Sequence, residues 1–216
     1  MLTDFNYTYY QENILIVGTT GTGKTTLVKE ILQSMPSANK WIWDLQGNFS
    51  GMGKTVFRFE DIDDPNQSYV IDSYDKSPDY FNRYCQYIVD NARVWRLSNI
   101  VNVVDEVQEF TNPKQSSTAL QSIVTSLRNK GISNIFITPT PSLLPPWMKY
   151  NMHHVFAFST VGYDNIKYLD DNFFGEKAWL LAPPDIRKKL QNQPQLPKHS
   201  YIYRFRDSEE TVINTP

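Results

Sequence analysis

The segment GTTGTGKTT, from Gly18 to Thr26, constrains the fold of this chain more than any other stretch. It fits the pattern G-x-x-x-x-G-K-[ST], in which glycines let backbone amides curl around a phosphate group. The apolar run from Asn13 to Val17 precedes it and predicts a buried parallel strand. Apolar residues at helical spacing follow from Leu27 to Met35, and Pro36 ends them. Strand, glycine-rich loop and helix in this order indicate a site for nucleotide phosphates.

The residue types in this loop fit a nucleoside triphosphate. We expect Lys24 to reach the β- and γ-phosphates and the Thr25 hydroxyl to hold Mg²⁺. The dipole of the helix behind the loop adds positive potential. The predicted nucleotide-binding residues are Gly18, Thr19, Thr20, Gly21, Thr22, Gly23, Lys24, Thr25 and Thr26.

A second stretch, SGMGKTV from Ser50 to Val56, also contains Gly-Lys-Thr, but its surroundings differ. Asn48 stands where the pattern needs its first glycine. The residues from Thr55 to Phe59 alternate like a β-strand, so no helix dipole would point at the amides of this stretch. We interpret Gly51 and Gly53 as hairpin-turn residues.

Strands alternate with helices along the rest of the chain, which predicts an α/β fold with a mainly parallel central sheet flanked by helices. Further strands are predicted at Lys40–Asp44, Thr55–Phe59, Tyr69–Ile71, Ile100–Val104, Asn134–Thr138, His154–Phe158, Ala178–Leu181 and Tyr201–Phe205. Further helices are predicted from Pro78 to Trp95, from Asn112 to Gly131, from Asn165 to Asp171 and from Asp185 to Leu190, with a proline-rich loop from Pro139 to Pro146.

The composition of the chain narrows the possible classes of protein further. The chain has 216 residues and 40% hydrophobic content, which fits a single domain over 1–216, with 182–216 as a candidate basic extension. One cysteine, Cys85, excludes an intrachain disulfide, and with three histidines it disfavours a structural zinc site. The net charge of −2 does not suggest a broadly basic nucleic-acid surface, although a local basic strip fits it. We expect no leader peptide and no transmembrane segment.

Asp105 and Glu106 follow the predicted strand that ends at Val104. A carboxylate at this position holds the water shell of Mg²⁺, and an acid beside it is placed to polarise a water for attack on the γ-phosphate. A small-molecule kinase does not need the second acid, because its substrate supplies the nucleophile. The chain also lacks an Asn-Lys-x-Asp guanine reader. We therefore predict ATP hydrolysis, with Thr25 and Asp105 as metal ligands and Lys24 and Glu106 as catalytic residues.

Several segments resemble the FtsK–HerA superfamily of hexameric DNA-pumping ATPases. They are WDLQGNF, VVDEVQEF, SLRNKGISNIFITPTPSLLP and VFAFSTVGYDNIKYLDDNFFGEKAWLL, within a resemblance that covers the chain from about Asn13 to Leu181. The Arg-x-x-Gly-Ile turn, the Thr-x-x-Pro-Ser step and the Asp-Asn-x-x-x-Leu helix are its more specific parts. The resemblance implies a P-loop NTPase of the RecA/FtsK type with an additional strand and a catalytic glutamate, and it implies ATP and Mg²⁺.

The resemblance also implies a catalytic role for Arg128. In the family, an arginine just before the fourth core strand enters the active site of a neighbouring subunit, and Arg128 occupies the matching position. A guanidinium there neutralises charge on the transferring phosphoryl group. The alternative is a helix-end cation that satisfies the dipole. Where the family usually has a glutamine sensor, this chain has Pro139, which leaves Thr138 or Thr140 as candidate sensors.

The short chain looks most like the genome-packaging ATPases of viruses with an internal membrane. That resemblance implies a homo-oligomeric ring (hexamer or pentamer), double-stranded DNA as partner, docking at a capsid vertex or another protein, and a location in the host cytoplasm or on the virus particle. Two alternatives stay open. One is a plasmid-mobilisation or secretion ATPase of the same superfamily. The other is a regulatory nucleotide-binding module with negligible turnover, which Pro139 favours.

The carboxyl-terminal part of the chain carries the candidate DNA contacts. A ring would gather several copies of such basic residues and bind the DNA backbone without sequence preference. The alternative, an ordinary solvated face, is equally compatible with the sequence. The candidates are Arg187, Lys188, Lys189, Lys198, Arg204 and Arg206.

Overall fold

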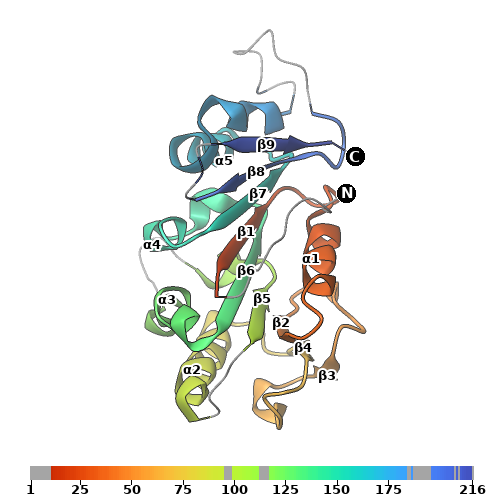
Figure 1. Cartoon of the computed structure of the whole chain (residues 1–216), viewed down its shortest axis with the longest axis vertical. Helices are drawn as coiled ribbons and strands as arrows, with labels where there is room; N and C mark the ends of the chain where they lie inside the picture. The colour runs from red at the N-terminus through yellow and green to blue at the C-terminus, as the bar shows by residue number, and fades with distance from the viewer. Residues whose placement is uncertain are drawn as a thin grey trace.

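A nine-stranded sheet forms the centre of the computed structural model, in the order β3-β4-β2-β5-β6-β1-β7-β8-β9 (Figure 1). The structure describes residues 11–94, 99–111, 117–183, 186, 196–206, 208 and 210–215. The strands are β1 Asn13–Val17, β2 Asn39–Trp43, β3 Lys54–Val56, β4 Tyr69–Ile71, β5 Ile100–Val104, β6 Ile132–Thr138, β7 His154–Phe158, β8 Tyr201–Phe205 and β9 Thr211–Asn214. Strands β1 to β7 are parallel, whereas β8 and β9 pair in antiparallel fashion. The predicted α/β class is confirmed.

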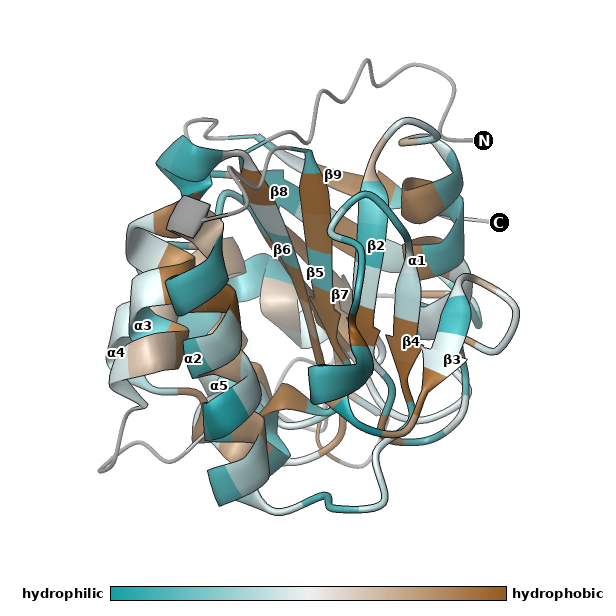
Figure 2. Ribbon diagram, turned by 90° about the horizontal axis from the view of Figure 1, so that it is seen from below, coloured by the Kyte–Doolittle hydropathy of each residue, from teal (hydrophilic) through white to brown (hydrophobic). Residues whose placement is uncertain are grey.

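The helices lie on both faces of the sheet (Figure 2). They are α1 Lys24–Gln33, α2 Pro78–Val94, α3 Thr118–Thr125, α4 Pro146–Lys149 and α5 Tyr163–Leu169. Short 3-10 turns occupy Phe59–Asp61, Val107–Phe110, Leu127–Lys130, Pro141–Leu143 and Gly175–Leu181, and a π turn occupies Asp170–Phe174. Helix α1 covers one face, and α2, α3, α4 and α5 cover the other.

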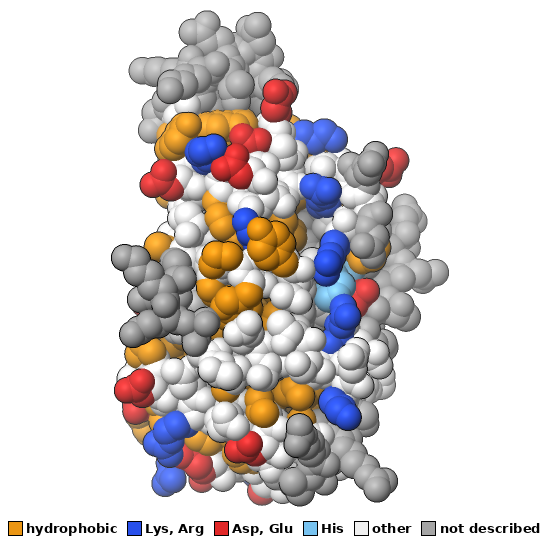
Figure 3. Space-filling model, turned by 90° about the vertical axis from the view of Figure 1, so that its left-hand side faces the viewer, with side chains coloured by type: hydrophobic (Ala, Val, Ile, Leu, Met, Phe, Trp, Pro, Cys, Tyr) orange, Lys and Arg blue, Asp and Glu red, His pale blue; other side chains and the backbone are white. Residues whose placement is uncertain are grey.

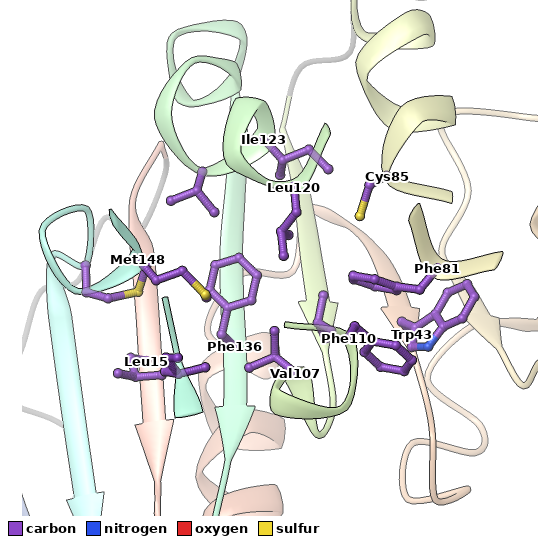
Figure 4. Packing of buried hydrophobic residues seen from close by; sticks show 14 of the residues in the cluster. Leu15, Trp43, Phe81, Cys85, Val107, Phe110, Leu120, Ile123, Phe136 and Met148 are labelled. Carbon is purple, nitrogen blue, oxygen red and sulfur yellow. The ribbon is translucent and has the colours of Figure 1, made fainter. Parts of the chain in front are cut away.

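Buried side chains on the two faces form separate cores, because successive residues of a strand point to opposite faces. In β1, Ile14 and Ile16 pack with α1, whereas Leu15 and Val17 belong to the core under α2 and α3. Figure 4 shows the second core, where Leu15 and Phe136 of the strands and Leu120 of α3 point into one cluster. The near-continuous apolar runs of β1, β5 and β7 are what a sheet covered on both faces requires.

The parallel register brings functional segments to one edge of the sheet, which we call the carboxyl edge. Val17 at the end of β1 lies beside Thr138 at the end of β6, and Val104 at the end of β5 lies beside Phe136. The segments that follow these strands therefore meet at this edge, as ligand sites of open α/β sheets do. The opposite end, where the parallel strands begin, is the amino edge.

Several predicted elements are wrong. The residues from Ala178 to Leu181 form part of a 3-10 turn rather than a strand, and the sheet position beside β7 is taken by β8. Strand β3 ends at Val56, and Phe59 begins a 3-10 turn. Strand β9 and helix α4 were not predicted; α4 begins at Pro146, where the predicted loop ends.

Gly51 and Gly53 do not form a hairpin, because β3 runs parallel to β4. Gly51 does lie in a turn, with a φ of +83°. At Gly53 a side chain is excluded by proximity: a Cβ atom would lie 2.6 Å from the carbonyl oxygen of Ser68.

The helix predicted from Pro78 to Trp95 reaches past the described residues at Trp95, and two other predicted helices fall partly outside them. One is the helix predicted to begin at Asn112, which lies outside the described residues. Within them, α3 begins after Ser117, whose hydroxyl accepts from the backbone N–H of Leu120 at 3.1 Å. The α-helix ends at Thr125, earlier than predicted, and the separate 3-10 turn Leu127–Lys130 ends at Gly131, whose φ is +87°. The helix predicted from Asp185 to Leu190 also lies outside, apart from Ile186.

Candidate nucleotide site

The glycine-rich loop connects β1 to α1 at the carboxyl edge, as predicted. Gly18 has a φ of +150°, and the amide of Gly18 donates to the carbonyl of Thr138 at 3.2 Å. A Cβ atom at Gly18 would lie 2.7 Å from the Cβ of Phe158, so only glycine fits where β1 ends. Gly23, with a φ of +107°, is the residue before the first turn of α1. The loop therefore turns sharply and aims the amino end of α1 at its own concavity.

Lys24 is folded into this loop. Its side chain is buried, and its ammonium donates to the carbonyl of Thr19 at 3.0 Å. Burial lowers the pKa of Lys24, while the nearby carboxylates of Glu106 and Asp105 act in the opposite direction. The Thr22 hydroxyl also donates to the Thr19 carbonyl, at 2.7 Å. Lys24 and the two acidic residues predicted from sequence thus lie close enough to interact.

Asp105 and Glu106 follow β5, as predicted. Asp105 is buried, and its backbone amide donates to the carbonyl of Trp43 at 3.1 Å. Burial, with a smaller contribution from the charge of Glu106, raises the pKa of Asp105 to about 6. A bound cation would stabilise the negative charge of a buried carboxylate that lies beside a second acid.

Glu106 adopts a left-handed backbone conformation, with φ 51° and ψ 49°. A non-glycine residue in this region is uncommon, and strained residues of this kind cluster at active sites and ligand clamps. The side chain is held from two sides: Gln46 Nε2 donates to one carboxylate oxygen at 3.0 Å, and Gln108 Nε2 donates to the other. The carboxylate is therefore fixed in direction, half-buried beside Asp105.

The loop after β2 supplies residues that the motif analysis missed. The buried Asp44 carboxylate accepts the backbone amides of Asn48 at 2.9 Å and Phe49 at 2.8 Å, which shapes the turn. Asn48 Nδ2 then donates to Asp105 at 3.4 Å. The quoted segment WDLQGNF contained these residues, but their role depends on β2 lying beside β5.

The two candidate sensors, Thr138 and Thr140, lie at the carboxyl end of β6. Thr138 is fully buried, and its hydroxyl already accepts from the Thr140 amide at 3.1 Å. The Thr140 hydroxyl oxygen is buried and has no hydrogen-bond partner among the described residues. Thr140 therefore has more hydrogen-bonding capacity left for a ligand than Thr138.

A cavity of about 350 Å³ adjoins the loop on the side of α1. Gly23, Leu27, Phe158, His199 and Tyr201 are among its lining residues. The Phe158 and Tyr201 rings lie 5.2 Å apart, and His199 Nδ1 lies 3.3 Å from the Thr22 carbonyl. Aromatic walls next to a phosphate loop suit the planar base of a nucleotide.

The donor set at the carboxyl edge fits Mg²⁺. Hard oxygen ligands are what this ion prefers, and the site offers the Asp105 carboxylate and the hydroxyl of Thr25 on the first turn of α1. Burial and the charge of Glu106 raise the pKa of Asp105, and a cation bound beside this carboxylate would act in the opposite direction. No cluster of three or more histidine, cysteine, aspartate or glutamate side chains suggests another metal centre in the described part of the chain.

Arg128 lies at the amino edge, away from the glycine-rich loop. It belongs to the 3-10 turn Leu127–Lys130 that precedes β6, and its Nη1 contacts His153 Nε2 just before β7. Because the loop follows the opposite ends of these strands, Arg128 and the loop stand at the two ends of one sheet.

The predicted basic strip is split between the two edges. Lys198 precedes β8 on the side of the glycine-rich loop, next to His199. Arg204 lies near the other end of β8, and the Arg206 amide donates to the His153 carbonyl at 2.8 Å. Arg187, Lys188 and Lys189 lie outside the described residues. Among the described helices, none combines the length and hydrophobicity that a membrane crossing needs.

Comparisons with known proteins support the fold that carries this site. A family model for the DNA-binding domain of type IV secretion-system coupling proteins matches residues 4–54. The DNA-packaging ATPase B204 from Sulfolobus turreted icosahedral virus superposes with a TM-score of 0.74 at 20% identity, over 95% of this chain and 98% of that one. B204 of Sulfolobus turreted icosahedral virus 2, in complex with ATP-gammaS, gives 0.73 at 18% identity, over 95% and 97%.

A conjugation protein is similar over a smaller part of its length. The pCW3 conjugation coupling protein TcpA, with ATPgS, gives a TM-score of 0.57 at 16% identity, over 95% of this chain and 60% of that one. No curated protein is similar enough in sequence to be matched. The chain has a P-loop NTPase fold, the fold of the B204 packaging ATPases, as its glycine-rich loop and its order of strands and helices predicted.

Proposed function

We propose that this chain hydrolyses ATP and uses the energy to move double-stranded DNA, packaging a viral genome into a preformed capsid. The observation that carries the hydrolytic part is Glu106, held in a left-handed conformation between Gln46 and Gln108 beside Asp105. A fixed carboxylate next to a metal-binding acid is suited to orient a water for in-line attack on the γ-phosphate.

The other groups at the carboxyl edge have separate roles in this proposal. The loop amides and Lys24 bind the phosphates, and the base occupies the aromatic cavity beside α1. Thr25 and Asp105 hold Mg²⁺, which supplies charge neutralisation on the phosphate oxygens when it is bound. Thr140 accepts or donates a hydrogen bond near the reacting phosphate in place of the family glutamine.

The proposed working form is a ring of five or six copies. Arg128 would then serve a neighbouring subunit, because it stands at the opposite end of the sheet from its own loop. DNA would pass through the ring, contacted by Lys198 and by Arg187, Lys188 and Lys189. Docking at a capsid vertex in the host cytoplasm completes the packaging role.

Steady-state ATP hydrolysis, with and without linear double-stranded DNA at two salt concentrations, tests the proposal. We expect DNA to stimulate turnover and salt to remove the stimulation, because backbone contacts release counterions. Glu106→Gln should lower turnover by about 10²- to 10⁴-fold while ATP still binds, since a general base is lost. Arg128→Ala should lower it by about 10³- to 10⁵-fold. Hydrolysis that DNA does not stimulate would contradict the proposed movement of DNA, but the proposed ATP hydrolysis would stand.

A second candidate is a plasmid-mobilisation or secretion ATPase, which the coupling-protein match over residues 4–54 favours. Capture of capsid proteins in a pull-down would support packaging, whereas capture of relaxosome proteins would support mobilisation. A regulatory module, favoured by Pro139, predicts tight ATP binding with turnover no higher than that of Glu106→Gln.

A further inference from the structure

Asn13 is a fully buried amide at the amino edge, at the start of a strand whose other residues are apolar. Burial of a primary amide is unfavourable unless its hydrogen bonds are made within the protein. Here both amide hydrogens and the amide oxygen have partners. Asn13 Nδ2 donates to the carbonyls of Val124 and Asn151, each at 2.9 Å, and Asn13 Oδ1 accepts from Asn134 Nδ2 at 2.8 Å. The side chain therefore joins several segments of the amino edge to β1.

One of these segments leads directly to Arg128. Val124 lies in the last turn of α3, and the 3-10 turn Leu127–Lys130 that carries Arg128 follows within three residues. The last four carbonyls of a helix have no partner inside the helix, so a donor from outside can fix the helix end. Asn13 supplies such a donor at 2.9 Å from the Val124 carbonyl. It thereby ties the end of α3, and the turn after it, to β1.

The backbone of Asn13 fixes the ring that borders Arg128, which is His153. The Asn13 N–H donates to His153 Nδ1 at 3.0 Å, and the His153 N–H donates to the Asn13 carbonyl at 2.8 Å. Burial and the charge of Arg128 lower the pKa of His153, so the ring is neutral at neutral pH. A neutral imidazole that accepts at Nδ1 carries its proton on Nε2. Nε2 contacts Arg128 Nη1, which is also a donor, so the ring borders the guanidinium without holding it by a hydrogen bond.

The Arg128 guanidinium has no acceptor of its own among the residues that the structure describes. No carboxylate there pairs with it, and its contact is with His153. Figure 3 shows a column of Lys and Arg side chains, interrupted by a histidine, along the face that carries α3 and α4. Like charges repel, so neighbouring cations do not hold a guanidinium in place. The position of Arg128 therefore depends on the backbone of its turn and on the ring beside it, and Asn13 fixes both.

We propose that Asn13 is a positioning residue for Arg128, because it holds the turn Leu127–Lys130 and His153 on either side of the guanidinium. The catalytic consequence rests on the proposed function, whereas the positioning itself requires no ATP hydrolysis. A displacement of about 1 Å in a catalytic group can slow a reaction about 10²-fold. Loss of the Asn13 side chain should act on the chemical step rather than on nucleotide binding, since the glycine-rich loop lies at the other end of β1.

A double-mutant cycle in steady-state ATP hydrolysis tests the catalytic consequence. Asn13→Ala should lower kcat about tenfold or more and leave KM within about twofold, because the displaced group acts only on the chemical step. In the Arg128→Ala background the same substitution should have no further effect on kcat, since the group that it positions is already absent. An equal fold loss of kcat in both backgrounds would overturn the proposal, because Asn13 would then support the fold alone.

Tyr84→Phe is the matched control, since it removes a hydrogen bond of the same buried network away from Arg128. Tyr84 donates to Asn102 at 2.9 Å, and Asn102 donates to Asn134, the partner of Asn13. This variant should keep kcat within about twofold of wild type. A loss as large as that of Asn13→Ala would assign the effect to the whole network and contradict the proposal. If Asn13→Ala does not fold, Asn13→Thr replaces it, because threonine suits a strand and its hydroxyl can keep one hydrogen bond.

A spectroscopic measurement separates the positioning from the proposed hydrolysis. Asn129 is exposed on the turn that carries Arg128, and Cys85 is buried and is the only cysteine, so Asn129→Cys directs a nitroxide label to this turn. Electron paramagnetic resonance should show a more mobile label when Asn13→Ala is added, and no change when Tyr84→Phe is added. That result in a chain that hydrolyses no ATP would keep the positioning and reject the hydrolase. Unchanged mobility with Asn13→Ala would reject the positioning, whatever the turnover.

Discussion

Gly18 stands where β1 ends, and the neighbouring strand β7 leaves no room for a side chain there. A Cβ atom would lie 2.7 Å from the Cβ of Phe158, and the φ of +150° is one that L-residues rarely adopt. We expect Gly18→Ala to lower the free energy of unfolding by about 2–4 kcal/mol, since strain adds to overpacking. Urea denaturation of the nucleotide-free protein measures this.

Gly21 is the matched control for that experiment. Its φ of +77° also disfavours a side chain, but no atom lies within 4 Å of its Cβ position. Gly21→Ala should therefore lower the free energy of unfolding by only about 1–2 kcal/mol, because only the backbone strain contributes. Equal losses in the two variants would show that crowding against Phe158 contributes nothing.

Glu106 combines a strained backbone with a catalytic assignment, so two amide substitutions should separate the two properties. Glu106→Gln and Glu106→Asn both remove the carboxylate, so both should hydrolyse ATP about 10²- to 10⁴-fold more slowly. Asparagine tolerates the left-handed region better than glutamine. We expect Glu106→Asn to be more stable than Glu106→Gln by about 0.5–1 kcal/mol in urea denaturation. Identical stabilities would mean that the conformation with φ 51° stores no strain.

His153 makes stability depend on pH. Its pKa lies below the ordinary value of 6.5 in the folded protein, because burial and Arg128 disfavour the charged ring. The stability that this provides is present above pH 6.5 and is lost as the pH falls through the folded-state pKa. The free energy of unfolding should therefore drop below about pH 6.5. His153→Gln should show a shallower drop when both proteins are denatured in urea across this pH range.

At the scale of elements, a ladder of buried amides ties the middle strands together. Tyr84 of α2 donates to Asn102 of β5 at 2.9 Å, Asn102 donates to Asn134 of β6 at 3.0 Å, and Asn134 donates to Asn13 of β1 at 2.8 Å. Asn13 Nδ2 then donates to the carbonyls of Val124 and Asn151, each at 2.9 Å. The ladder links α2 to the segments that carry Arg128 and His153.

Asn134→Ala should be strongly destabilising, because it leaves buried amide groups of two neighbours without partners. We expect a loss of about 2–5 kcal/mol in the free energy of unfolding. Asn91→Ala is the control: among the described residues its side chain bonds the carbonyl of Tyr87 alone, one turn earlier, so the loss should be less than about 1 kcal/mol. A small effect at Asn134 would indicate that water or repacking replaces the ladder.

The sequence predicts some elements well and others poorly, for physical reasons. The glycine-rich loop and the Asp105–Glu106 pair lie where the sequence predicted them, because their positions depend on local spacing next to a strand. The contacts of Gln46 and Asn48 with these acids were not, because they depend on β2 lying beside β5, which is set by the whole sheet. The segment from Ala178 to Leu181 has the composition of a strand but is a 3-10 turn.

At the scale of the whole molecule, the proposed ring predicts that defective copies impair normal ones. Glu106→Gln copies would still bind ATP and would occupy positions between active neighbours. When they are mixed with wild-type protein at constant total concentration, turnover should fall below the straight line expected of independent subunits, because neighbouring sites are coupled. A linear decrease would indicate that each subunit works alone.

The placement of the glycine-rich loop and Arg128 at opposite ends of one sheet has a consequence for symmetry. In a head-to-tail contact, the loop of one copy meets the Arg128 edge of the next, and such a heterologous contact has no two-fold axis. A pair joined this way exposes one unmatched loop and one unmatched Arg128 edge, each able to add another copy. Growth therefore stops only when the rotation per step closes a circle, and a small error in that rotation gives an open helical filament instead.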